Sequence, residues 1–217
     1  FVSADATGAG NDRIAVGDGD NVVLGGSGTD TITTGAGADV VLGDNGFVTF
    51  TGGIRLEAKS DPAGGARDTI RTGAGADLVI GGLGGDTIDA GKDDADDDIV
   101  FGDNGHVTFD GPGRVKRAES LDLGLGDDDT IEVGGGDNVV IGSAGSDDIT
   151  TGSGADIVLG DTGVVTFENG LVREVYTTDE RRGAGDVIRG GDGDNIVFGG
   201  AGRDEITTGK GADLILG

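Results

Sequence analysis

The chain has 217 residues, of which 49 are glycine and none is cysteine, and its 41 acidic and 15 basic side chains give a formal net charge of −26. So acidic a chain is a poor partner for nucleic acid, and no segment approaches the roughly 18 apolar residues of a membrane-spanning helix. High net charge with few apolar residues is typical of disorder. Here the apolar residues recur periodically, so we expect a fold that forms once the negative charge is compensated.

A nine-residue unit recurs along the chain, and residues 25–33 (GGSGTDTIT) show it most completely. We expect its first six residues to form a turn, because glycine permits positive φ and leaves no Cβ between stacked backbones. The last three residues predict a short strand with an apolar residue, Ile32, at its centre. In chain order, the first units are residues 7–15, 16–24, 25–33 and 34–42.

A longer repeat contains these units. The tetrapeptides GDNG, GDNG and GDTG begin at residues 43, 102 and 160, which gives a block of about 58 residues made of four units and an insert. The chain is therefore expected to be a single tandem-repeat array, 1–217. Its blocks are residues 6–62, 63–122, 123–180 and 181–217, the last without an insert. Residues 1–5 are similar to residues 175–179, so we interpret them as the tail of an earlier insert and the chain as a fragment of a longer protein.

The two kinds of strand differ in polarity. Strands of odd-numbered units, such as TIT at 31–33, have one apolar residue, whereas those of even-numbered units, such as VVL at 40–42, are apolar on both faces. A strand of the second kind is typical of a sheet covered on both sides. We expect the inserts to cover it; the alternative is a face that binds a partner or a second copy of the chain.

The inserts predict β-hairpins, and Asn169-Gly170 between two apolar runs is a strong hairpin-turn signal. Apolar residues spaced two apart project from one face of a strand. The residues expected to face the apolar sheet are Val48, Phe50, Val107, Phe109, Val165 and Phe167, with Ile54, Leu56, Val115 and Leu171 or Val172 from the returning segments.

The sixth position of each unit carries an acidic or amide side chain. Carboxylate and carbonyl oxygens, roughly six to eight of them, are the ligands of Ca²⁺, whereas the lack of cysteine and the single histidine disfavour zinc. The predicted metal ligands are Asp12, Asp30, Asp39, Asp68, Asp77, Asp86, Asp98, Asp129, Asp147, Asp156, Asp186, Asp204 and Asp213, with Asn21, Asn138 and Asn195 at the remaining positions. The asparagine turns are expected to bind calcium more weakly or through a neighbouring carboxylate. The acidic run 93–97 is interpreted as a solvated loop, with an extra ion site as the alternative.

Units two apart stack on the same edge of such an array, so their sixth residues are expected to share an ion. The predicted pairs are Asp12 with Asp30, Asp68 with Asp86, Asp77 with Asp98, Asp129 with Asp147, Asp186 with Asp204, Asn21 with Asp39, Asn138 with Asp156, and Asn195 with Asp213.

The pattern of residues 25–33, G-G-x-G-x-D-x-apolar-x, resembles the calcium-binding nonapeptide repeat of the RTX (repeats-in-toxin) family. The resemblance implies an all-β fold, a parallel β-roll solenoid threaded with calcium ions, here with a β-hairpin insert in each block. Proteins of this family are usually secreted by bacteria. We expect on the order of eight Ca²⁺ ions, two per block, and folding outside the cell when calcium binds.

No residues assemble into a catalytic constellation. His106 is the only histidine, and its counterparts in the other inserts are Phe47 and Val164, so a surface position on a hairpin is expected rather than a general base. Basic residues of the inserts, such as Arg55 and Arg114, are expected to face the acidic roll.

The predicted function is a non-catalytic calcium-binding spacer or scaffold region of a large secreted or cell-surface bacterial protein, similar to an RTX adhesin. Its expected partners are calcium ions and neighbouring repeat blocks. One alternative is a calcium-dependent folding and secretion region attached to a secreted enzyme or toxin. Another is an ice-binding or self-associating solenoid.

Overall fold

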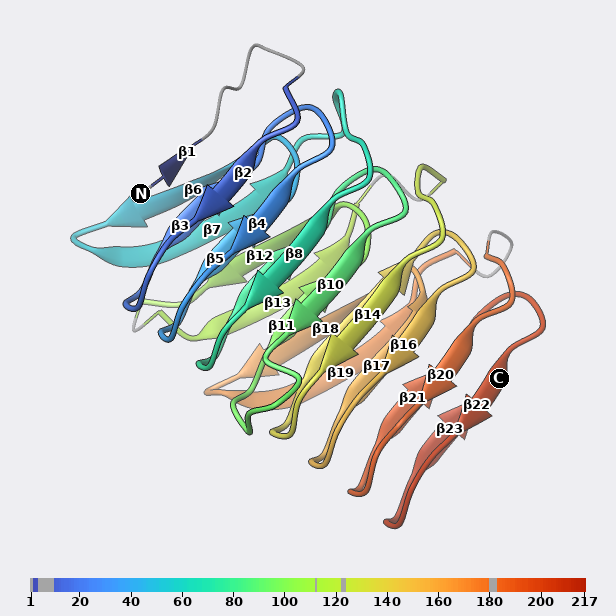
Figure 1. The fold of residues 1–217 in the computed structure, drawn as a ribbon. Helices are drawn as coiled ribbons and strands as arrows, with labels where there is room; N and C mark the ends of the chain where they lie inside the picture. The colour runs from blue at the N-terminus through green and yellow to red at the C-terminus, as the bar shows by residue number, and fades with distance from the viewer. Residues whose placement is uncertain (1, 4–9, 112, 122–123, 180–182) are drawn as a thin grey trace.

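The computed structural model describes residues 2–3, 10–111, 113–121, 124–179 and 183–217. Within these residues the strands form three sheets, and the chain winds through two of them in successive coils from the N-terminus to the C-terminus (Figure 1). This confirms the predicted all-β solenoid. The described residues include no helix long and apolar enough to cross a membrane.

The strands of the even-numbered units, with β1 at one edge, form a parallel sheet, which we call the covered sheet. In spatial order it comprises β1 (Val2–Ser3), β3 (Val22–Leu24), β5 (Val40–Leu42), β9 (Leu78–Ile80), β11 (Ile99–Phe101), β15 (Val139–Ser143), β17 (Ile157–Asp161), β21 (Ile196–Phe198) and β23 (Leu214–Leu216). The strands of the odd-numbered units form a second parallel sheet, the open sheet. It comprises β2 (Arg13–Ala15), β4 (Thr31–Thr33), β8 (Thr69–Thr72), β10 (Thr87–Ala90), β14 (Thr130–Val133), β16 (Asp148–Thr150), β20 (Val187–Arg189) and β22 (Glu205–Thr207).

Side chains from the middle of each strand fill the space between these two sheets. Ile32 pairs in register with Ile70 in the open sheet, and Val41 pairs with Val79 in the covered sheet. All four side chains belong to one buried apolar cluster and have no exposed surface. Because the strands are parallel and in register, each coil adds one apolar layer to a continuous core.

The inserts form the third sheet, which we call the lid sheet. It comprises the hairpins β6 (Gly46–Thr51) with β7 (Ile54–Ser60), β12 (Gly105–Phe109) with β13 (Val115–Ser120), and β18 (Gly163–Glu168) with β19 (Leu171–Thr177). The hairpins are also joined to one another, because β7 pairs with β12 and β13 pairs with β18, both antiparallel. This joining was not predicted. At the tip of the third hairpin, Asn169 and Gly170 have φ of 56° and 81°, as the predicted turn requires.

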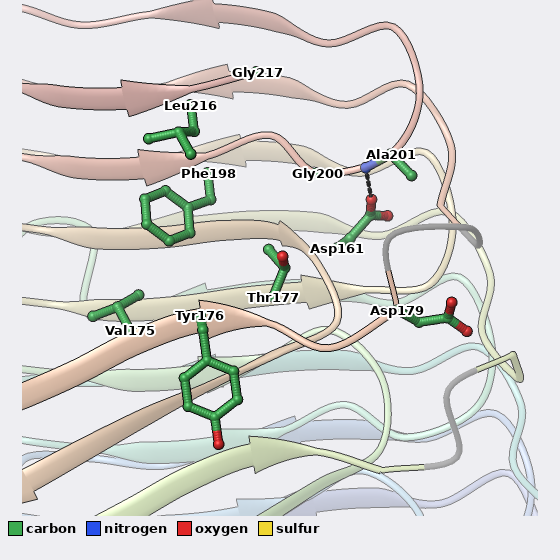
Figure 2. A pocket seen from close by; sticks show the side chains of 10 residues that line it. All are labelled: Asp161, Val175, Tyr176, Thr177, Asp179, Phe198, Gly200, Ala201, Leu216 and Gly217. Carbon is green, nitrogen blue, oxygen red and sulfur yellow. Dashed lines mark hydrogen bonds between the residues drawn. The ribbon is translucent and has the colours of Figure 1, made fainter.

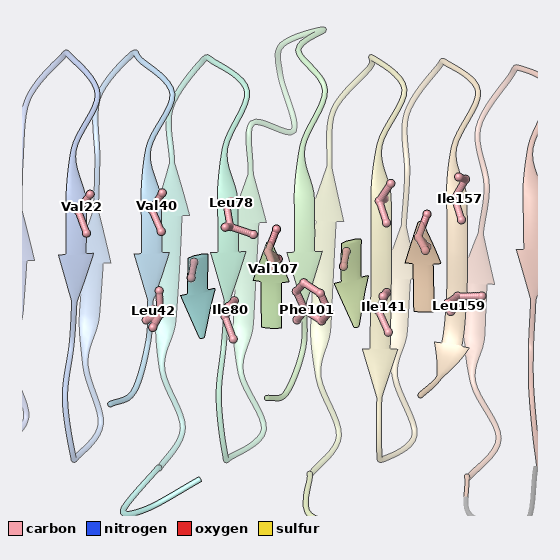
Figure 3. Close-up of a cluster of buried hydrophobic side chains, with 14 of the residues drawn as sticks. Val22, Val40, Leu42, Leu78, Ile80, Phe101, Val107, Ile141, Ile157 and Leu159 are labelled. Atoms are coloured by element: carbon pink, nitrogen blue, oxygen red, sulfur yellow. The ribbon is translucent and has the colours of Figure 1, made fainter. Parts of the chain in front are cut away.

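The lid sheet packs on the outer face of the covered sheet, as predicted. Figure 3 shows the shared cluster, in which Val107 of β12 lies among Leu78, Ile80 and Phe101. Each hairpin begins with a glycine over the last apolar residue of the preceding strand: a Cβ on Gly105 would lie 2.6 Å from the Phe101 ring. The chain's own hairpins therefore cover this face over most of its length, whereas Leu214 and Leu216 of β23 are exposed.

The prediction was wrong for several lid residues. Phe50, on β6 at the edge of the lid sheet, is 46% exposed, whereas Val48, Phe109, Val115 and Phe167 are partly buried and pack against the cluster of the covered sheet as predicted. Ile54, Leu56, Leu171 and Val172 are also exposed. Near the tips the hairpins leave open pockets against the covered sheet, one lined by Phe50 and Ile54 together with Val22 and Leu78. The buried contacts of the returning strands come instead from Ala58 and Ala118.

Residues 2–3 do not lie where the tail of an insert would. They form β1, which pairs in parallel with β3 at the edge of the covered sheet, whereas the corresponding residues 176–177 lie in the lid sheet. The interpretation as an insert tail is therefore wrong for Val2 and Ser3. The backbone edge of β3 explains the difference, because it offers hydrogen bonds that an extended segment can satisfy. Phe1, Ala4 and Asp5 lie outside the described residues.

The basic residues of the hairpins meet acidic groups in two ways. Arg55 reaches the roll, donating to the Ala38 carbonyl at 3.5 Å; burial lowers its pKa, and the carboxylates of Asp20 and Asp77 oppose that shift. Arg114 instead pairs with Asp110 of its own hairpin at 2.7 Å. The expected contact with the acidic roll is therefore observed for Arg55, whereas Arg114 has its ion pair within the hairpin.

Candidate calcium sites

The sixth-position residues line up in two rows, one along each edge of the roll. In each row the backbone N–H of one residue donates to the side-chain Oδ1 of the next, at 2.7–3.2 Å. The first ladder is Asp12, Asp30, Asp68, Asp86, Asp129, Asp147, Asp186 and Asp204. The second ladder is Asn21, Asp39, Asp77, Asp98, Asn138, Asp156, Asn195 and Asp213. Strand stacking fixes both rows, because each residue directly precedes a strand.

All the residues predicted to pair are neighbours in these ladders. The contacts also continue where no pair was predicted, as from Asp30 to Asp68 and from Asp39 to Asp77. The inserts do not interrupt the rows, because each hairpin leaves and returns within one coil. In the stretched unit, Asp98 occupies the ladder position, while Asp94 accepts hydrogen bonds from the amides of Gly75 and Asp96.

The second carboxylate oxygen, Oδ2, is left over in most ladder aspartates. It is buried and has no hydrogen-bond partner in Asp30, Asp39, Asp68, Asp77, Asp86, Asp98, Asp129, Asp147, Asp156 and Asp186. A buried carboxylate oxygen without a partner is costly unless a cation or a proton compensates it. The pKa values of most of these aspartates are raised, as expected for carboxylates that are buried without a counter-ion. Burial, followed by the charge of neighbouring carboxylates, raises the pKa of Asp86 to about 9 and that of Asp129 to about 11.

Backbone carbonyls converge on the same points as these oxygens. A Cβ on Gly25 would lie 2.0 Å from the Gly43 carbonyl oxygen and 2.7 Å from Asp30 Oδ2. A Cβ on Gly142 would lie 2.4 Å from both the Gly160 carbonyl oxygen and Asp147 Oδ2. Glycine keeps this space free. The resulting mixture of carboxylate and carbonyl oxygens suits a hard cation such as Ca²⁺.

Among the described residues, no group of three or more histidine or acidic side chains is arranged to hold a metal ion. An ion in the ladders would therefore take a few carboxylate oxygens and complete its shell with carbonyls or water. Calcium tolerates this irregular, oxygen-only coordination, whereas Mg²⁺ requires a stricter octahedron. The donor set thus fits calcium.

The asparagine turns differ from the aspartate turns. Asn138 Nδ2 donates to the carbonyls of Gly134, Gly135 and Gly136 at 3.2–3.3 Å and to Asp156 Oδ1 at 3.0 Å. Asn21 and Asn195 donate to glycine carbonyls of their own turns in the same way. The amide group therefore satisfies turn carbonyls that an aspartate would leave for an ion.

The sequence prediction missed the aspartates of the block tetrapeptides, Asp44, Asp103 and Asp161. All three are buried, with at most 1% of their surface exposed. The signal was present, since GDNG and GDTG place an aspartate where the repeat has its second glycine. In the sequence, however, those motifs predict only the block length.

His106 lies in the lid sheet, away from the ladders. Its Nε2 is 2.9 Å from Glu57 Oε1 and its Nδ1 is 3.0 Å from Glu119 Oε1, so the ring links β12 to both neighbouring strands. Burial of its side chain is partial, with 19% exposed. The histidine is thus a cross-strand contact on a hairpin.

Two stacked parallel sheets, glycine turns and rows of buried carboxylates along both edges define a parallel β-roll with cation-binding turns. The sequence model of the family described as RTX calcium-binding nonapeptide repeat (4 copies) matches residues 7–41, 33–53, 62–94, 123–163 and 183–215. These ranges span most of the chain, and the chain belongs to this family of calcium-binding repeats. No curated protein and no solved structure matches the chain significantly.

Proposed function

We propose that this region is a non-catalytic spacer or scaffold in a large secreted or cell-surface protein, with a role similar to that of RTX adhesins, and that it folds when it meets extracellular calcium. The observation that carries the proposal is the row of buried Oδ2 atoms without partners along both edges of the roll. These buried carboxylates destabilise the folded roll at low calcium, and their contacts with bound ions stabilise it at high calcium. An array assembled from similar coils suits a spacer, because each added coil lengthens it without changing its architecture.

The charge balance supports coupling between folding and calcium. Carboxylates on neighbouring coils lie about 4.8 Å apart, and at an effective dielectric of about 20 such a pair repels by roughly 3 to 4 kcal/mol. On the order of eight Ca²⁺ ions would contribute about +16 against the formal net charge of −26. The metal-free chain should therefore be largely unfolded at neutral pH.

Far-UV circular dichroism of the purified chain in chelator and then in millimolar calcium tests this proposal. We expect a disordered spectrum in chelator and a strand-rich spectrum in calcium, with magnesium at the same concentration much less effective. A strand-rich spectrum in chelator at neutral pH would contradict the proposal.

A further inference from the structure

Each hairpin is inserted into a turn rather than between coils. In an uninterrupted turn, such as residues 25–30, the backbone runs continuously from the first glycine to the ladder aspartate. At Asp44 the chain instead leaves the roll, forms β6 and β7, and returns at Gly65 shortly before Asp68. The turn therefore consists of a departing half that ends at Asp44 and a returning half that runs from Gly65 to Asp68. The two halves are joined covalently only through the hairpin. The other interrupted turns run from Asp103 to Asp129 and from Asp161 to Asp186.

The departing aspartate bridges the gap. Asp44 Oδ1 accepts the amide of Ala66 in the returning half at 3.4 Å, and Oδ2 accepts the amide of Leu83 in the next coil at 2.6 Å. Asp44 is 1% exposed. Its carboxylate thus lies inside the interrupted turn.

The other two interrupted turns repeat this arrangement. Asp103 accepts the amides of Asp127 at 3.3 Å and Ala144 at 2.9 Å. Asp161 accepts the amide of Ala201, as Figure 2 shows. Three separate hairpins therefore place a buried carboxylate at the same structural position.

The returning ladder aspartate lies close to the departing residues. A Cβ on Gly43 would lie 2.5 Å from Asp68 Oδ2, and a Cβ on Gly65 would lie 2.1 Å from Asp44 Oδ2. Each half of the turn thus has a glycine facing the carboxylate of the other half.

The same reciprocal geometry occurs at the later hairpins. Gly102 faces Asp129 Oδ2 at 2.1 Å and Gly126 faces Asp103 Oδ2 at 2.0 Å, both measured from the Cβ position. At the third hairpin, Gly160 faces Asp186 Oδ2 at 2.2 Å and Gly183 faces Asp161 Oδ2 at 2.0 Å.

The ladder aspartates of these turns lack a partner for Oδ2. Asp68, Asp129 and Asp186 are at most 2% exposed, and the Oδ2 atom of each has no hydrogen bond. Burial is the main cause of their raised pKa values, and the departing carboxylate adds to it, Asp103 being the strongest charged contributor at Asp129. A buried carboxylate oxygen without a partner, close enough to a second buried carboxylate to feel its charge, is costly unless a cation or a proton compensates it.

We propose that each interrupted turn holds a divalent cation shared by its departing and returning aspartates, Asp44 with Asp68, Asp103 with Asp129 and Asp161 with Asp186. This inference rests on the calcium-bound state proposed above and adds ligands that the nonapeptide pattern does not contain. The shared ion closes the turn that the hairpin opens. Loss of the ion frees the root of the hairpin, so docking of the lid sheet depends on calcium.

Ion counting on the full chain tests the proposal. Asp44→Asn, Asp103→Asn and Asp161→Asn are compared with Asp93→Asn, which removes the same charge from an exposed loop residue. Bound calcium is counted by native mass spectrometry after circular dichroism has established that each variant reaches the wild-type spectrum in calcium. We expect one ion fewer per chain in each root variant and no loss in the control. An unchanged count would overturn the proposal and leave these residues as hydrogen-bond acceptors only.

Terbium luminescence provides a second measurement, and its decisive outcome is read on the wild type. Tyr176 is the only tyrosine, the chain has no tryptophan, and Tyr176 lines the same pocket of about 410 Å³ as Asp161 (Figure 2). We expect tyrosine-excited terbium emission from the wild type, loss of most of it in Asp161→Asn, and no change in Asp44→Asn. A terbium-loaded wild type that emits on direct excitation but not through tyrosine would refute the site at Asp161. Failure of the wild type to bind calcium at all would instead contradict the proposed function.

Discussion

Phe101 lies where the covered sheet meets the lid sheet, and its removal should weaken that junction strongly. The side chain has no exposed surface and belongs to the cluster that β12 and β13 cover (Figure 3). Gly105 at the start of β12 contacts its ring. Phe101→Ala removes a fully buried aromatic ring from a site held rigid by two sheets, so we expect the free energy of unfolding to fall by about 3 to 5 kcal/mol.

Urea unfolding in saturating calcium measures this loss. With a slope of roughly 2 kcal/mol per M, the midpoint should fall by roughly 1.5 to 2.5 M. Phe50→Ala is the control for loss of a phenylalanine ring, because Phe50 lies in the lid sheet and is 46% exposed, and its loss should cost about 1 kcal/mol or less. Equal midpoint shifts for the two variants would refute the assignment of the buried interface.

The ladders give three further predictions. Asp30→Ala removes a carboxylate from the first ladder and should lower the calcium affinity of the tightest site by at least roughly tenfold, whereas Asp94→Ala should lower it less. Equal calcium affinities of the two variants in titration would count against the ladder assignment. Asn138→Asp replaces an amide that fills its own turn, so we expect the variant to bind an additional calcium ion in calorimetric titration, and an unchanged stoichiometry would argue that the turn is closed for another reason. Burial raises the folded-state pKa of Asp68 to about 8 and that of Asp86 to about 9, from 3.8. Protonation therefore favours the metal-free folded state below about pH 4, and this stabilisation is lost as the pH rises through the folded-state pKa values. Circular dichroism in chelator should show more strand at about pH 4 than at about pH 8, and a pH-independent spectrum would contradict this.

The roll was predictable because its determinants are periodic. One apolar residue per odd strand and three per even strand identify the two sheets, and the sixth-position aspartates mark both edges. The pairing of β7 with β12 and of β13 with β18 was not predictable in the same way, because these are backbone hydrogen bonds between strands from different inserts. Likewise, Phe50 is exposed although Phe109, at the same place in the second hairpin, packs against the cluster; β6 is the edge strand of the lid sheet, and the order of strands in that sheet is not written in the repeat.

The root aspartates were missed for a different reason. The tetrapeptides show that an aspartate replaces the second glycine of the repeat, but not that its side chain is buried, because the turn around Asp44 is completed by Gly65, which lies beyond an entire hairpin in the sequence. Only the folded chain brings the two together. The same is true of the link that His106 makes between Glu57 and Glu119, whose positions in separate hairpins are not periodic.

The lid sheet changes how far a local loss of calcium spreads along the array. In a simple solenoid each coil contacts only its neighbours, so an unfilled turn destabilises one or two coils. Here the root of the first hairpin lies at Asp44, while its returning strand β7 pairs with β12 of the next block and β13 pairs with β18 of the block after it. Release of one hairpin therefore removes a backbone partner and part of the apolar cover from the following block. With the proposed root ions in place, the hairpins would thus link calcium binding at the first ladder to burial of the covered sheet over a distance of more than one block.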